Sequence, residues 1–130
     1  MNPWTVLTSV LALLFYFSTS ANVARQRHKH AILAPAMSGH PSVERALRVQ
    51  GNTLEWLVIF LPSLWMFSSY WSPLVGSALG LVWVIGRALY MAGYMRDVKS
   101  RAAGFGIQLL ATFVLLLGAA IGAARALSIS

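Results

Sequence analysis

The sequence contains no cysteine and only three acidic residues among its 130 positions. The missing cysteine excludes a disulfide framework, a thiolate metal site and a protein thiol nucleophile. Charged residues make up 10% of the chain, whereas soluble domains contain about a quarter. Hydrophobic residues make up 58%. A soluble globule of this composition would expose a large apolar surface to water, so we exclude that class and expect an integral membrane protein with a single domain over residues 1–130.

Long runs without charge divide the chain into membrane-spanning segments. The first charge is Arg25, so residues 1–24 can cross about 30 Å of hydrocarbon as one helix. A cleaved signal peptide is the competing interpretation, but it needs basic residues before the apolar run, and here they follow it. The uncharged run 56–86 is too long for one crossing, and Pro73 supplies the reversal. The sequence therefore predicts an all-α bundle of four transmembrane helices, over about residues 4–24, 43–69, 74–96 and 102–125.

The basic residues show which side of the membrane each loop occupies. Ten Lys or Arg give a net charge of +7. They gather between the first and second helices and between the third and fourth, while the turn between the second and third carries none. The positive-inside rule places both basic loops in the cytoplasm and both termini outside it. The basic excess thus indicates topology and attraction to anionic lipid headgroups, and we expect no nucleic-acid partner. The three histidines have no acidic or cysteine companions in sequence, so we expect no metal site.

A stripe of polar residues enters the membrane with the second helix. Glu44, Arg48, Asn52 and Glu55 are separated by four, four and three positions, which places them on one helical face. Glu55 lies roughly 15 Å past Arg45, a depth at which an unpaired charge costs at least about 2.5 kcal/mol. Glu55 therefore needs a cation or a proton.

The third helix carries a matching stripe, formed by Arg87, Tyr90, Tyr94, Asp97 and Arg101. Arg87 reaches a depth close to that of Glu55, so we expect these two residues to form an ion pair between antiparallel helices. That pair could serve only to hold the two helices together.

The mouth of the two stripes offers more donors than helix packing requires. It combines two guanidinium groups, a carboxamide and two phenols near the cytoplasmic surface. These groups belong to Arg48, Asn52, Tyr90, Tyr94 and Arg101. A small anionic ligand would satisfy them.

Two motifs within these helices resemble those of a known family. The stretch VERALRVQGNTLE at residues 43–55, continuing to FLPSLW at 60–65, is similar to the second-helix signature of the MAPEG family, the membrane-associated proteins of eicosanoid and glutathione metabolism. GRALYMAGY at 86–94, followed by Arg101, resembles the third-helix motif.

The resemblance implies a homotrimer that binds glutathione between neighbouring subunits at the cytoplasmic end. It also implies a role in detoxification. Arg101 matches the arginine that activates the glutathione thiol. Trp56 is a departure, because some members carry a ligand-contacting tyrosine there. The positions that match glutathione-binding residues are Arg25, Arg48, Gln50, Asn52, Glu55, Tyr90 and Tyr94.

The leading hypothesis is therefore a glutathione transferase, with possible glutathione peroxidase activity, that acts on lipophilic electrophiles or hydroperoxides reaching it from the bilayer. No metal is needed for this chemistry, and glutathione is the co-substrate. A small proton-coupled transporter, using Glu55 as its membrane carboxylate, is one alternative. A family member that binds glutathione without turnover is the other.

Overall fold

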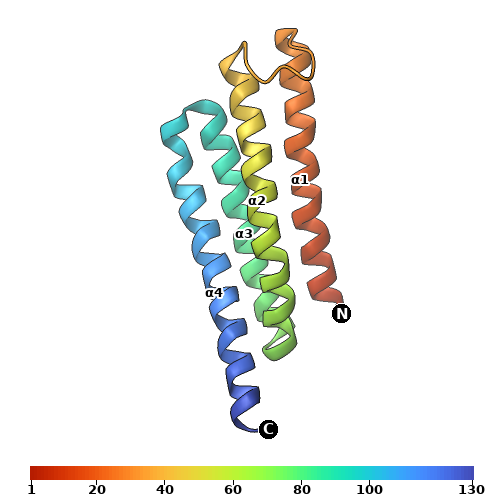
Figure 1. Cartoon of the computed structure of the whole chain (residues 1–130), viewed down its shortest axis with the longest axis vertical. Coiled ribbons are helices and arrows are strands. Elements are labelled where there is room, and N and C mark those ends of the chain that lie inside the picture. The colour runs from red at the N-terminus through yellow and green to blue at the C-terminus, as the bar shows by residue number, and fades with distance from the viewer.

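The structure is a computed structural model that describes residues 1–130, and it is entirely helical. Four long helices follow one another along the chain, as the charge-free runs predict, and a short 3₁₀ turn, η1, precedes the last (Figure 1). The all-α class and the four helices are thus confirmed. The elements are α1 (Pro3–His30), α2 (Pro41–Tyr70), α3 (Pro73–Arg96), η1 (Val98–Arg101) and α4 (Ala102–Ser128).

The first three helices begin in the same way, with a capping side chain followed by a proline. Pro3, Pro41 and Pro73 occupy the first helical position, where a missing N–H costs nothing. The residue before each proline accepts a hydrogen bond from a backbone N–H of the first turn. The expected reversal at Pro73 is therefore a capped helix start, reached through the two-residue turn after Tyr70.

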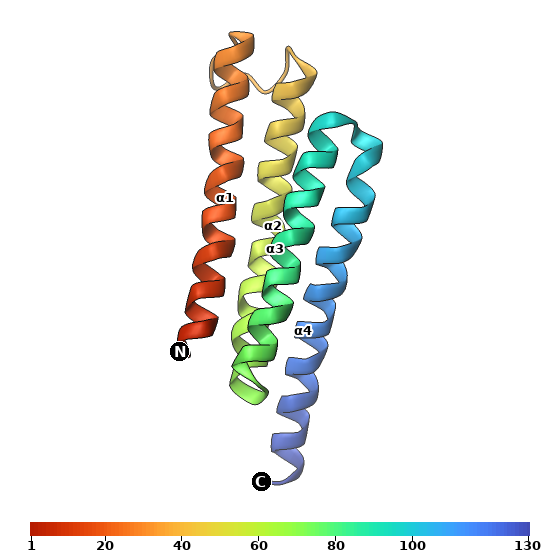
Figure 2. The same ribbon diagram turned by 180° about the vertical axis from the view of Figure 1, so that it is seen from behind.

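The helices run alternately up and down the bundle. Both termini and the α2–α3 turn lie at one end, whereas the α1–α2 loop and η1 lie at the other (Figures 1 and 2). α2 and α3 form the centre, and α1 and α4 each pack against both of them. The two basic segments predicted from the sequence therefore share one end of the molecule, which we call the basic end.

Three of the helical segments are long and apolar enough to cross a membrane: Pro3–His30, Pro73–Arg96 and Val98–Ser128. Most of each apolar stretch is exposed on the surface of the subunit, which suits contact with lipid. α2 has 30 residues but does not share this character, because its first half carries the polar stripe. Its crossing, and the side of the membrane that each end faces, stay predictions.

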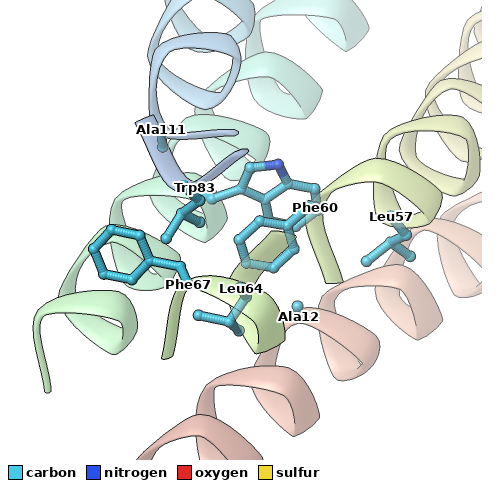
Figure 3. Close-up of a cluster of buried hydrophobic side chains, with 8 residues drawn as sticks. Ala12, Leu57, Phe60, Leu64, Phe67, Trp83 and Ala111 are labelled. Atoms are coloured by element: carbon cyan, nitrogen blue, oxygen red, sulfur yellow. The ribbon is translucent and has the colours of Figure 1, made fainter. Parts of the chain in front are cut away.

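The apolar core occupies the middle of the bundle, on the side of the polar stripes away from the basic end. Phe60 of α2 and Trp83 of α3 stack with ring centroids 4.1 Å apart and an interplanar angle of 9° (Figure 3). Both side chains are fully buried. Leu64 and Leu115 complete the centre of this cluster, and Ala12 of α1 packs at its edge, so the core joins all four helices.

α3 and α4 approach one another most closely through glycines near the basic end. A Cβ on Gly104 would overlap the backbone nitrogen of Tyr90, and one on Gly86 would lie 2.8 Å from the backbone nitrogen of Gln108. Only glycine permits this spacing, as is common where membrane helices cross. The contact fixes the first turn of α4 against the part of α3 that carries Tyr90.

Candidate functional site

A polar cavity of about 470 Å³ opens near the basic end, between α2, α3 and the start of α4. All five residues that the sequence predicts at the mouth of the stripes line it: Arg48, Asn52, Tyr90, Tyr94 and Arg101. Its volume is within the range of small-molecule sites, about 300–1,000 Å³. The cavity combines two guanidinium groups, a carboxamide and two phenols, which is a donor set suited to a small anion.

The helix geometry brings these residues together. α2 descends from the basic end while α3 rises toward it, so Asn52 and Tyr90 lie at the same level of the bundle. Arg48 and Tyr94 lie one turn nearer the basic end on their own helices, because each is four residues away from that level. Arg101 joins them because η1 turns the chain back immediately after α3.

Arg87 is the one charged side chain that is fully buried, and its partners correct the sequence-based expectation. The predicted Glu55–Arg87 ion pair is not formed in the subunit. Arg87 instead donates from Nη1 to the Asn52 Oδ1, at 2.9 Å, and from Nη2 to the Thr53 Oγ1, at 2.6 Å. Its guanidinium carbon also lies 4.2 Å from the centroid of the Tyr90 ring. Helical register explains the difference, because Asn52 and Thr53 point toward α3 while Glu55 points outward.

Glu55 pairs with Arg48 on its own helix. The Arg48 Nη1 lies 3.2 Å from the Glu55 Oε1, and this is the one salt bridge in the subunit. The side chains are 56% and 61% exposed, so the pair contributes at most about 1 kcal/mol to stability. Arg48 is thus part of the cavity wall and also the partner of the nearby carboxylate.

The two tyrosines and Arg101 form the wall of the cavity nearest the basic end. The ring centroids of Tyr90 and Tyr94 are 5.6 Å apart, and the Arg101 guanidinium carbon lies 5.6 Å from the Tyr94 ring. Arg101 donates from Nη1 to the Val98 carbonyl at 2.8 Å, which uses only part of its donor capacity. The exposed guanidinium can therefore still bind a ligand atom.

Three of the predicted site residues, Arg25, Gln50 and Glu55, do not line this cavity, although Glu55 pairs with Arg48, which does. Gln50 donates from Nε2 to the Ser20 hydroxyl of α1, at 3.0 Å, on another side of α2. Arg25 donates from Nη2 to the Asn22 Oδ1, at 2.7 Å, and lines a separate hollow of about 360 Å³ between α1 and α3. Within one subunit, then, the predicted set is not gathered in one place: five residues line the cavity, while Arg25 and Gln50 lie elsewhere on the bundle.

Three residues of the first turns of α4 complete the cavity, and the sequence reasoning did not include them: Ala102, Phe105 and Gly106. Phe105 makes an edge contact with Trp56, with centroids 5.6 Å apart, and a tilted contact with Tyr90 at 6.0 Å. Trp56 therefore packs on Phe105 and does not line the cavity. Phe105 lies one turn after Arg101 in a predicted helix, and this spacing could have indicated that both residues face the same cavity.

The N-terminus of α4 adds partial positive charge at the same place. Arg101 occupies its N-cap position, and no side chain accepts a hydrogen bond from the first turn. The dipole of α4 favours an anion near this end of the helix. No group of three or more metal-ligating side chains is assembled in the structure. The arrangement is therefore suited to binding and stabilising a small anion by charged and polar donors.

Comparison with known proteins assigns a family. The family model described as "MAPEG family" matches residues 5–121. An uncharacterized protein of Synechocystis sp., sll1147, is 42% identical over 116 residues, which are 89% of this chain and 85% of that protein. Human microsomal glutathione S-transferase 2 is 37% identical over 85% of this chain and 74% of its own length. Leukotriene C4 synthase of Cavia porcellus is 32% identical over 88% and 76%, respectively.

Proposed function

This chain belongs to the MAPEG family, and on that basis we propose that it is a membrane-embedded glutathione transferase that also reduces hydroperoxides. The observation that carries the proposal is the polar cavity, in which Arg48, Asn52, Tyr90, Tyr94 and Arg101 converge. Relatives named as glutathione S-transferase and leukotriene C4 synthase support the choice of glutathione.

The chemistry of glutathione suits the cavity. The tripeptide has two carboxylates, an ammonium group and a thiol. Arg48 and the Asn52 carboxamide can bind carboxylate oxygens, and Glu55 can exchange its pairing with Arg48 for the ammonium of the ligand. The exchange costs little, because the Arg48–Glu55 pair is exposed.

Arg101 is the residue that we assign to activation of the thiol. A free thiol has a pKa of about 8.5, so only a few per cent is ionised at neutral pH, and the thiolate is the nucleophile. An adjacent guanidinium lowers the pKa of the thiol, and each unit corresponds to about 1.4 kcal/mol. The N-terminus of α4 acts in the same direction, because it lies beside Arg101. The protein itself contributes no nucleophile, in agreement with its lack of cysteine.

Two reactions follow from the thiolate. With an apolar electrophile, the sulfur forms a bond to carbon while the leaving group departs with the electron pair. With a lipid hydroperoxide, the sulfur attacks the terminal oxygen and the O–O bond breaks, so the lipid leaves as an alcohol and glutathione becomes a sulfenic acid. A second glutathione then displaces water and forms the disulfide.

We also propose that the complete site lies between subunits of a homotrimer. Arg25 and Gln50 lie on other sides of their own subunit, so a neighbouring subunit would have to supply them. The trimer, the single membrane domain over residues 1–130 and the cytoplasmic position of the basic end are parts of this proposal. Membrane lipid and a lipophilic second substrate are the remaining partners.

The decisive experiment compares binding with turnover in the purified protein. We expect calorimetry to detect glutathione and its S-hexyl analogue with wild-type protein. Arg101→Ala should still bind the S-hexyl analogue, because the analogue has no ionisable thiol for Arg101 to stabilise. The same variant should lose conjugation. Arg125→Ala is the matched control, because Arg125 lies over the Trp71 ring at the other end of the bundle.

Three outcomes would contradict parts of the proposal. Undiminished conjugation by Arg101→Ala would refute the role of Arg101. A wild-type protein that binds neither ligand would refute the proposed function. Binding without turnover of any electrophile or hydroperoxide in a broad panel would identify a non-catalytic family member.

A further inference from the structure

Resting on the proposed function, we propose that Arg87 is a positioning residue that turns the Asn52 carboxamide so that its NH₂ group faces the cavity. The site then offers a fixed donor, the Asn52 Nδ2, to a carboxylate or carbonyl oxygen of glutathione. Arg87 itself does not line the cavity. It acts through a residue that does.

The orientation of the amide follows from the chemistry of its partner. A guanidinium carries five N–H donors and no acceptor. The Asn52 atom that faces the Arg87 Nη1 at 2.9 Å must therefore be the oxygen. The Nδ2 is left on the opposite side of the carboxamide, toward the cavity that Asn52 lines.

The guanidinium is itself held in place by two further contacts. The Arg87 Nη2 donates to the Thr53 hydroxyl at 2.6 Å, and the guanidinium carbon lies 4.2 Å from the Tyr90 ring centroid. Thr53 donates in turn to the Val49 carbonyl, at 2.7 Å, which fixes its own hydroxyl. Arg87 therefore has little freedom to release Asn52, and the amide is oriented before any ligand binds.

Stability alone does not account for a cation at this position. Arg87 is fully buried, no carboxylate lies within 4 Å of its guanidinium nitrogens, and its Nε has no hydrogen-bond partner. A charge buried inside a membrane is expensive, and apolar replacements of buried charges are often neutral or stabilising. Buried charges of this kind usually mark function. Here one of the two hydrogen-bond partners of the guanidinium, Asn52, lines the binding cavity.

The test begins with the affinity for the S-hexyl analogue, measured by calorimetry on the full-length protein in detergent. Losing an oriented hydrogen bond to a charged group corresponds to a loss of about tenfold to a hundredfold in affinity. We expect Arg87→Met to weaken binding by that factor and to raise KM for glutathione while kcat at saturation changes little. Arg87→Lys, which keeps one donor, should recover part of the loss. Arg125→Met is the matched control and should leave the affinity unchanged.

A double-mutant cycle separates positioning from a general structural role. In an Asn52→Ala background, Arg87→Met should cause almost no further loss of affinity, because the group that it orients is gone. Additive losses would overturn the proposal.

Asn52→Asp gives an independent measurement in case Arg87→Met fails to fold. The aspartate can pair with Arg87 but presents only oxygen to the cavity, so we expect binding to fall at least tenfold. Tighter binding by Asn52→Asp would mean that Asn52 accepts from the ligand, and it would refute the assigned orientation. If wild-type protein does not bind the analogue at all, the proposed function fails. If wild type binds and Arg87→Met binds equally well, only the present inference fails.

Discussion

Replacing Gly104 by alanine should destabilise the subunit, although the same change two residues later should not. A Cβ at position 104 would overlap the backbone nitrogen of Tyr90, and it would lie 2.6 Å from the carbonyl oxygen of Gly86. These are backbone atoms, which cannot rotate away, so α3 and α4 would have to separate. A Cβ on Gly106 meets nothing within 4 Å.

The magnitude follows from two opposing terms. Overpacking costs up to about 3 kcal/mol, and alanine gains about 1 kcal/mol over glycine inside a helix. Gly104→Ala should therefore lose up to about 2 kcal/mol, whereas Gly106→Ala should gain up to about 1 kcal/mol. Unfolding in detergent micelles, followed by far-ultraviolet circular dichroism, measures both. Equal shifts in the two variants would refute the close crossing at Gly104.

Two other substitutions test smaller features of the structure. Glu55→Gln should change the free energy of unfolding by less than about 1 kcal/mol, because its pair with Arg48 is exposed. It should nevertheless weaken binding of glutathione more than binding of a derivative that lacks the α-amino group. Equal weakening of both ligands would argue against an ammonium contact. Trp71→Phe removes the hydrogen bond from the indole Nε1 to the Gly118 carbonyl and should destabilise the protein by about 1 kcal/mol; an unchanged unfolding midpoint would show that this bond contributes nothing.

The positions of charges and prolines made the fold predictable. A charge is expensive in lipid, so uncharged runs mark the helices, and Pro73 marks the reversal between the second and the third. The ends of the helices were less predictable. α1 continues to His30, beyond the predicted limit at residue 24, because its last turn carries basic residues that suit a helix C-terminus.

Helical spacing predicted the cavity but not the partners of its buried charge. Residues four apart share a face, which is sufficient to bring Asn52 and Tyr90 together across two helices. Depth alone suggested that Glu55 and Arg87 should pair. The partner of Arg87 is decided, however, by which side of α2 faces α3. The rotation of α2 about its own axis depends on the packing of the whole bundle, and it brings Asn52 and Thr53 to Arg87.

The closed interior argues against the transporter alternative. Transport through a subunit requires a polar path from one end to the other. The cavity lies near the basic end. On its side away from that end lies Arg87, which is fully buried and held by two hydrogen bonds. One turn further from the basic end on α3, Trp83 stacks on Phe60, and both rings are fully buried (Figure 3). A proton-coupled carrier would also need a carboxylate within that path, whereas Glu55 is 61% exposed and paired with Arg48. Buried side chains therefore close any polar path through the subunit beyond Arg87, which is expected of a binding site and not of a carrier.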